Sequence, residues 1–131
     1  MTGRREHAKT KIVVVEDDPE LLDLETFLLG AEGYQVTGVP DGESAASTVK
    51  REGADLVLLD LMLPGKDGNA VLVDLQGDPT TARAKVIVIS AFLNQLRATP
   101  QVRRVLSKPF DVTDLLEAVA QEADADDPLP V

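Results

Sequence analysis

Polar side chains follow four short apolar runs of the sequence, at the point where each run ends. Ile12–Val15 is followed by Glu16, Asp17 and Asp18, and Leu56–Leu59 is followed by Asp60. Val86–Ile89 is followed by Ser90, and Val105-Leu106 is followed by Ser107 and Lys108. If the runs are strands of an open α/β sheet, their carboxyl ends converge on one edge, where such proteins bind ligands. That edge would gather several carboxylates, one hydroxyl and one ammonium group.

These residue types suit a metal-assisted phosphoryl transfer. Clustered carboxylates repel each other, and a hard divalent cation such as Mg²⁺ relieves that repulsion through oxygen ligands. We therefore interpret Asp17 as a metal ligand, although Glu16 and Asp17 could also be solvated loop acids. Asp60 would be the nucleophile that forms an acyl phosphate. Lys108 and the Ser90 hydroxyl would bind the incoming phosphoryl group.

Helix capping is the competing explanation for the aspartates. Asp18 precedes Pro19, the pattern of an N-cap followed by proline at the first helical position, so we interpret Asp18 as a cap. Asp60 is separated from the next helix by Pro64-Gly65, and Asp67 is better placed to cap that helix. Asp60 therefore leaves a buried strand without a capping role, which favours the chemical interpretation.

Five apolar segments predict strands, and the segments between them predict helices. The strands are expected at Lys11–Val15, Tyr34–Val39, Asp55–Leu59, Lys85–Ile89 and Arg103–Leu106. The helical stripes are Leu21, Leu24 and Leu28 with Leu22 and Leu29 beside them, then Ala45, Ala46 and Val49, then Val71, Leu72 and Leu75, and last Leu115, Leu116, Val119 and Ala120. The expected N-caps of the four helices are Asp18, Asp41, Asp67 and Asp111. The alternation predicts an α/β fold on a doubly wound, five-stranded parallel sheet.

The composition narrows the class of protein. The chain has 131 residues, no cysteine and one histidine, His7, which excludes disulfides, thiol catalysis and a histidine-based metal site. A net charge of −10 and an aromatic content of 3% argue against direct binding of nucleic acid. No apolar run is long enough to span a membrane and the N-terminus lacks an apolar signal core, so we expect a cytoplasmic protein without membrane contact.

The two ends of the chain differ from its middle. Residues 1–10 are polar and mildly basic, whereas residues 123–131 are acidic and contain two prolines, so we expect both to be flexible. Residues 11–122 form the single predicted domain. We expect no effector domain after residue 122 and therefore expect output through a protein partner.

Four elements, in order and in register, resemble the receiver domain of bacterial two-component response regulators, in particular single-domain receivers of the chemotaxis type. They are Val15–Pro19 (VEDDP), Asp60–Gly68 (DLMLPGKDG), Ser90-Ala91 and Lys108–Phe110 (KPF), within a similarity that extends over Lys11–Glu122. The resemblance implies a flavodoxin-like strand order of 2-1-3-4-5 and Mg²⁺ as the cofactor.

The roles that the resemblance implies fall into two groups. The residues that handle the phosphoryl group are Asp60 as the phosphoacceptor, Ser90 as the switch hydroxyl and Lys108 as the cation. The implied magnesium ligands are Asp17 directly, Glu16 mostly through water, Asp60, and the backbone carbonyl of Met62. The resemblance also implies a cis peptide bond between Lys108 and Pro109.

Two features depart from the family pattern. Val105 stands three residues before the site lysine, where the family commonly has an aromatic switch residue. The connection after Ser90 is shorter than usual, and Pro100 disfavours helix at the residue before it, so we predict a short fourth helix around Leu93–Ala98. Phosphorylation is therefore expected to order residues 90–106 rather than to rotate a ring.

The resemblance implies a signalling module that catalyses only its own phosphorylation and dephosphorylation. Its implied partners are a sensor histidine kinase or a histidine phosphotransfer protein and a downstream protein effector, with the chain a monomer or weak dimer. Two alternatives stay open. A degenerate receiver could act only as a docking scaffold. A phosphatase of the haloacid-dehalogenase type could also use Asp60, but it needs a second aspartate where this chain has Met62.

The residues two positions beyond Asp60 and Ser90 bear on the lifetime of an acyl phosphate. Met62 and Phe92 stand there, and neither offers a strong hydrogen bond to an attacking water molecule. We therefore predict slow self-dephosphorylation, unless the two side chains merely cover the edge of the sheet.

Overall fold

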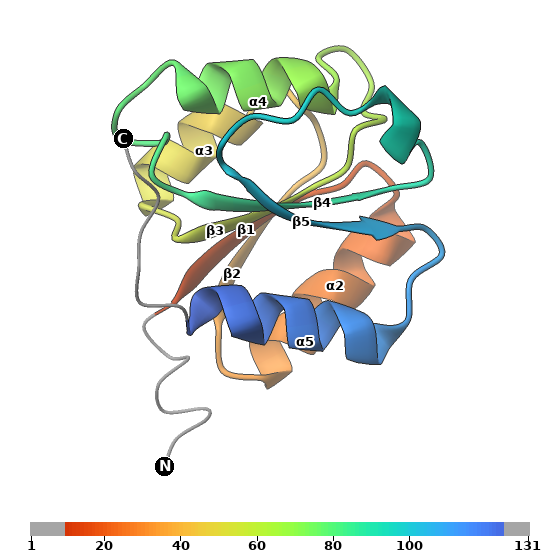
Figure 1. Ribbon diagram of the computed structural model, residues 1–131. Coiled ribbons are helices and arrows are strands. Elements are labelled where there is room, and N and C mark those ends of the chain that lie inside the picture. The colour runs from red at the N-terminus through yellow and green to blue at the C-terminus, as the bar shows by residue number, and fades with distance from the viewer. Residues whose placement is uncertain (1–9, 125–131) are drawn as a thin grey trace.

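The computed structural model describes residues 10–124, and these contain one parallel sheet of five strands (Figure 1). The strands are β1 (Lys11–Val15), β2 (Gln35–Val39), β3 (Leu56–Leu59), β4 (Lys85–Ser90) and β5 (Val102–Ser107). Their order across the sheet is β2-β1-β3-β4-β5, and every neighbouring pair is parallel. The predicted fold and strand order are confirmed, and each predicted strand end lies within one residue of the observed end.

Two cores lie on opposite faces of the sheet and are covered by different helices (Figure 1). The helices are α2 (Pro19–Ala31), α3 (Ala45–Glu52), α4 (Gly68–Gln76) and α5 (Val112–Ala123). Val13, Val57 and Val86 pack with residues of α3 and α4. The residues that alternate with them pack with α2 and α5. Because both faces are buried, the central strands are apolar throughout, as expected for a covered parallel sheet.

Aspartate side chains begin three of these helices as predicted. Asp18, Asp67 and Asp111 each accept hydrogen bonds from backbone amides in the first turn of α2, α4 and α5, respectively. Asp41, the fourth predicted cap, instead accepts a hydrogen bond of 2.7 Å from the amide of Ser44, which precedes the first residue of α3. These caps satisfy amide groups that have no partner within a helix.

Helix α2 turns a different face to the sheet from the predicted one. The leucine spacing predicted an apolar face of Leu21, Leu24 and Leu28 with Leu22 and Leu29 beside it, but the Leu24 side chain is 43% exposed. The buried residues are Glu25 and Leu29. The prediction was wrong for Leu24 because the leucines of α2 spread over nearly half of its circumference, so the apolar spacing does not fix the rotation of the helix within that range. The observed rotation places a carboxyl group in the protein interior.

The connection from β4 to β5 contains a single 3₁₀ turn, η1 (Leu93–Gln95), rather than the short helix predicted over Leu93–Ala98. Beyond this turn, residues 96–99 have no regular secondary structure and residues 100 and 101 form a turn. Gln101 is buried and donates hydrogen bonds to two backbone carbonyls. Strand β5 then pairs with β4 through an irregular register, in which Val86 pairs with Val102 and Ile87 pairs with Arg104. The connection is too short to cover the sheet with a helix.

The predicted domain limits, residues 11 and 122, lie close to the two ends of the described residues. Helix α5 continues to Ala123, one residue beyond the predicted domain, and Asp124 is its C-cap. Apart from Thr10, Ala123 and Asp124, the predicted flexible segments 1–10 and 123–131 lie outside the described residues. Among residues 10–124, no helix has the length and apolar character needed to cross a membrane.

Candidate functional site

Strands β1 and β3 bring the acidic residues together. Val15 pairs with Leu59 in the parallel register, so Glu16 and Asp60 leave neighbouring strands at the same level. The Asp60 amide donates a hydrogen bond of 3.1 Å to the Val15 carbonyl, which extends the ladder into the site. Carboxylate oxygens of Glu16, Asp17 and Asp60 all lie within 4.8 Å of one another. The predicted clustering of carboxylates is therefore present.

Lys108 enters this cluster from the end of β5. Its Nζ atom donates hydrogen bonds of 2.7 Å to Asp60 Oδ2 and 2.8 Å to Glu16 Oε1. The peptide bond from Lys108 to Pro109 is cis, as predicted. The ammonium group thus joins two carboxylates that come from different strands.

Burial and the ion pairs act against each other at this site. Burial raises the pKa of Glu16 above its usual value, and the hydrogen bond from Lys108 only partly opposes the rise. Burial would lower the pKa of Lys108, but its hydrogen bonds to Asp60 and Glu16 outweigh that effect and raise the pKa. The lysine therefore stays charged at neutral pH and donates to both carboxyl groups.

The loop after Asp60 is held by two close backbone approaches. Asp60 Oδ1 accepts a hydrogen bond of 3.1 Å from the Met62 amide, while the Met62 side chain is 47% exposed. A Cβ atom at Gly68 would lie 2.6 Å from the Asp60 carbonyl oxygen. A Cβ atom at Gly42 would lie 1.9 Å from the Lys66 carbonyl oxygen. The two glycines therefore let α4 and the β2–α3 loop pack tightly around the loop that carries Asp60.

Ser90 ends β4 and is fully buried. Its Oγ atom accepts a hydrogen bond of 3.1 Å from the Phe92 amide. Its carbonyl oxygen accepts a hydrogen bond of 3.1 Å from the Lys108 amide, so Ser90 and Lys108 lie side by side at the ends of β4 and β5. The hydroxyl thus belongs both to the site and to the first turn of the β4–β5 connection.

Glu25 is a buried carboxyl that the sequence analysis missed. Its side chain is 1% exposed, and its Oε2 atom has no hydrogen-bond partner among residues 10–124. Burial raises the pKa of Glu25 to about 8, and the negative charge of Glu16 adds to the rise. Glu25 is therefore protonated at neutral pH. The signal that could have located it is its spacing of four residues from Leu29 on α2.

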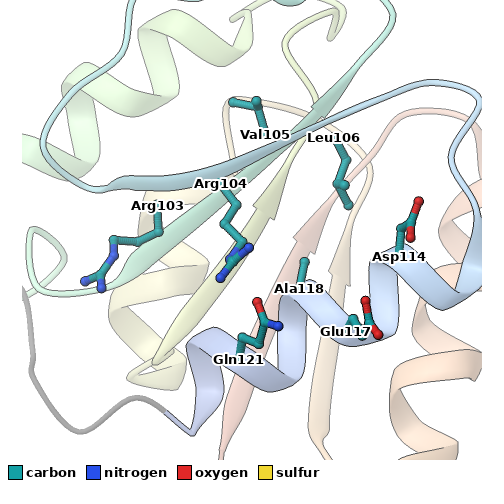
Figure 2. Close-up of a pocket in the computed structure, with 8 residues that line it drawn as sticks. All are labelled: Arg103, Arg104, Val105, Leu106, Asp114, Glu117, Ala118 and Gln121. Carbon is teal, nitrogen blue, oxygen red and sulfur yellow. The ribbon is translucent and has the colours of Figure 1, made fainter.

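A groove between β5 and α5 lies apart from the acidic cluster (Figure 2). Arg103 and Arg104 extend from β5 toward α5, and their Nε atoms lie 3.4 and 2.8 Å from carboxylate oxygens of Glu122. Val105 points away from α5, whereas Leu106 points toward it. The arginines fasten α5 to the edge strand, and the position with an aromatic residue in many receivers carries an exposed valine.

Comparison with known proteins gives a consistent assignment. Residues 12–120 match the family model of the response regulator receiver domain. The chain is 48% identical over 80 residues to the sensory transduction protein RegX3 of Mycolicibacterium smegmatis, across 61% of this chain and 33% of RegX3. The chain thus spans about a third of the length of this curated relative.

Solved structures agree with the family model. The receiver domain of the Pseudomonas aeruginosa sensor histidine kinase PA1611, which has a magnesium ion coordinated in its active site cleft, superposes with a TM-score of 0.81 at 27% identity, covering 88% of this chain and 98% of that one. The beryllofluoride-activated receiver domain of Klebsiella pneumoniae RstA gives 0.77 at 32% identity, covering 88% of this chain and 100% of that one. The fold, the acidic edge and the matched residues show that this chain belongs to the response regulator receiver domain family of two-component signalling.

Proposed function

We propose that Asp60 accepts a phosphoryl group and that the other site residues bind it there. The observation that carries this proposal is the position of the Asp60 carboxylate, which is 5% exposed and contacts Lys108 Nζ at 2.7 Å. A buried carboxylate next to a charged amine is held in its anionic, nucleophilic form. Family membership alone supports a signalling module, and this geometry extends that conclusion to self-catalysed phosphorylation.

The acidic cluster fits a magnesium ion. Mg²⁺ prefers oxygen ligands and keeps several water molecules, and the cluster offers the carboxylates of Asp17 and Asp60. Met62, whose amide donates to Asp60, is the residue from which the resemblance implies a carbonyl ligand. Both Glu16 oxygens already have partners, because Oε1 accepts from Lys108 and Oε2 accepts from the Asp18 amide at 3.1 Å. As the resemblance implies, Glu16 acts on the ion mostly through water. When bound, the ion supplies charge neutralisation for the phosphoryl oxygens.

The transfer needs one bond to form and one to break. A carboxylate oxygen of Asp60 attacks the phosphorus atom of a phosphohistidine, and the bond from phosphorus to the imidazole nitrogen breaks. The imidazole leaves with the electron pair and takes up a proton from solvent. Lys108, now bonded to Asp60, exchanges that bond for one to a phosphoryl oxygen, and the Ser90 hydroxyl donates to another. The product is an aspartyl phosphate.

The donor and the output partner belong to the proposal as well. We assign the donor to a sensor histidine kinase or a histidine phosphotransfer protein, since the transfer requires a phosphohistidine within reach of Asp60. Receiver domains occur within such kinases, as in PA1611. The output partner is a protein that distinguishes the two states of the domain. A second aspartate for a phosphatase of the haloacid-dehalogenase type is missing, because Met62 stands at that position.

Intact mass spectrometry tests the proposal directly. The protein is incubated with acetyl phosphate and magnesium, and we expect a mass increase of one phosphoryl group in the wild type and none in Asp60→Asn. Asp23→Asn on the exposed side of α2 is the matched control and should be labelled like the wild type. Stoichiometric labelling of Asp60→Asn would contradict the mechanism. A wild type that takes no label would favour the docking-scaffold alternative.

A further inference from the structure

The connection between β4 and β5 is fastened to α4 by one side chain. Asn69 Nδ2 donates a hydrogen bond of 2.9 Å to the Gln95 carbonyl, and Asn69 Oδ1 accepts one of 2.8 Å from the Arg97 amide. Asn69 lies at the start of α4, 26 and 28 residues away in the sequence from its two partners. Both ends of a single amide group thus hold the segment that stands where other receivers have a helix.

A continuous series of hydrogen bonds leads from the site to this contact. Ser90 Oγ accepts from the Phe92 amide at 3.1 Å, and the Phe92 carbonyl accepts from the Gln95 amide at 2.9 Å. The Gln95 carbonyl then accepts from Asn69. Ser90 and Asn69 contribute side-chain atoms to this series, and all its other donors and acceptors are backbone groups. A displacement of the Ser90 hydroxyl is therefore transmitted to the Asn69 contact by the 3₁₀ turn.

We propose that Asn69 is a latch that holds residues 91–101 against α4 until Asp60 is phosphorylated, an inference that rests on the function proposed above. The Ser90 hydroxyl must move to donate to the phosphoryl group, and the Phe92 amide is bonded to it. A small displacement breaks both hydrogen bonds of the latch, because a shift of about 1 Å would lengthen them beyond the roughly 3.5 Å limit of a hydrogen bond. Phosphorylation therefore opens the latch and frees Arg97, which is the opposite of the ordering of residues 90–106 expected from the sequence.

The composition of the segment supports this response. No residue of η1 is fully buried, and Ala98 and Pro100 after it are exposed, so the apolar packing that opposes the movement is limited to the partly buried Leu93 and Leu96. The end of the segment is different, because Gln101 is buried and bonded to the Thr81 and Ala84 carbonyls. The movement therefore stops before β5. Asn69 is a positioning residue of the switch and takes no part in the chemistry at Asp60.

Hydrogen exchange of the Arg97 amide reads the latch directly, because Asn69 Oδ1 is the acceptor for that amide. In the free wild type we expect this amide to be protected, and in Asn69→Ala to exchange about tenfold faster. Asn69→Asp retains the oxygen that accepts from Arg97 and suits a helix N-terminus, so it should restore most of the protection. Asn94→Ala, in the same exposed turn, is the control and should change nothing.

The second arm adds beryllofluoride with magnesium as a phosphoryl mimic and measures labelling by acetyl phosphate in parallel. We expect beryllofluoride to accelerate Arg97 exchange in the wild type and Asn94→Ala, and to cause no further change in Asn69→Ala, which should still be labelled at Asp60. Normal labelling with unchanged Arg97 exchange in the wild type would overturn the latch alone. Absence of labelling in the wild type would overturn the proposed function and, with it, the latch as a switch.

Discussion

The two connections that leave the site strands β3 and β4 are built in opposite ways. After β3 the chain forms α4, whose Val71, Leu72 and Leu75 are completely buried against the sheet. After β4 it forms only η1, in which no residue is buried. A segment with few buried apolar contacts opens at a lower free energy than a helix packed into a core. Asp60 is thus followed by a rigid connection and Ser90 by a soft one.

We therefore expect the two connections to control different steps, namely the phosphorylation of Asp60 and the structural change that follows it. Asp60, Asp17 and Glu16 lie on the strands and loops that pack with α3 and α4, so substitutions there should change whether the domain is phosphorylated. Substitutions in the β4–β5 connection should instead change what phosphorylation does to the surface. The predictions below test this division, beginning with the largest expected effect.

Asp17→Ala should abolish magnesium-dependent labelling while the fold survives. Asp17 is exposed and lies in the carboxylate cluster, so its loss removes a metal ligand without leaving a cavity. Because a bound metal ion contributes several kcal/mol to charge stabilisation, the rate of labelling by acetyl phosphate should fall on the order of 100-fold or more. Magnesium titration of the labelling rate is the measurement. An unchanged rate with the same magnesium dependence would refute the role of Asp17.

Glu25 should make the folding stability of the domain sensitive to pH. Its pKa is raised by burial to about 8, whereas the unfolded chain ionises it near 4.5, so the folded state alone retains the proton between these values. The free energy of unfolding should therefore fall as the pH rises from 4.5 to 8. Between pH 5 and pH 8 the wild type should lose about 3 kcal/mol more than Glu25→Gln.

Urea denaturation of both proteins across this pH range measures the difference. Asp23→Asn, an exposed carboxylate on the same helix, should follow the wild type. Parallel pH profiles for the wild type and Glu25→Gln would mean that Glu25 ionises as it does in the unfolded chain.

Gly68→Ala should strain the Asp60 loop, because the new Cβ atom would meet the Asp60 carbonyl oxygen and the Leu61 Cα atom at 2.6 Å each. Overpacking of this kind costs about 1–3 kcal/mol of folding stability. Gly30→Ala is the matched control in α2, where a Cβ atom meets nothing within 4 Å. That substitution should raise the stability by roughly 0.5–1 kcal/mol. Thermal unfolding compares the two, and equal shifts would contradict the tight packing at Gly68.

Residues at strand ends could be predicted from the sequence, because the parallel sheet dictates where they meet. Glu16, Asp60 and Lys108 each follow an apolar run, and any open α/β sheet brings such positions to one edge. The sequence placed these groups at one edge, and the structure adds the contacts of 2.7 and 2.8 Å between them. The site was therefore predictable to the extent that it depends on topology.

Features that depend on side-chain packing could not be predicted in this way. Glu25 lies in the core because α2 rotates about its axis, and the leucines of that helix allow more than one rotation. Asn69 binds residues 26 and 28 positions away, and a local sequence pattern contains no trace of such a contact. The β4–β5 connection was predicted to be short, but its collapse to one 3₁₀ turn depends on how Gln101 and Asn69 fasten its two parts.

Measurement of the lifetime of the aspartyl phosphate allows the two connections to be compared in one experiment. Met62 comes from the rigid connection and Phe92 from the soft one, and their side chains are 47% and 44% exposed at the edge of the site. Neither can hold a water molecule in line with the phosphorus, since phenylalanine has no polar atom and a thioether is a weak acceptor. We therefore predict slow self-dephosphorylation of the wild type.

Polar replacements should speed this hydrolysis to different extents. Met62→Asn should accelerate it about tenfold, equivalent to about 1.4 kcal/mol of barrier, because the rigid loop holds the new amide in one place. Phe92→Glu should have the smaller effect, because the segment that carries it moves when Asp60 is phosphorylated and holds a water molecule less firmly. Val73→Thr on α4, exposed but outside the cluster, is the control. Loss of label is followed by intact mass after removal of the phosphodonor.

A wild-type half-life of seconds, or a double variant no faster than the wild type, would show that these side chains do not control access of water. A larger effect at Phe92 than at Met62 would instead mean that the connection after β4 is ordered in the phosphorylated state, and the contrast between the two connections would then hold only for the free protein.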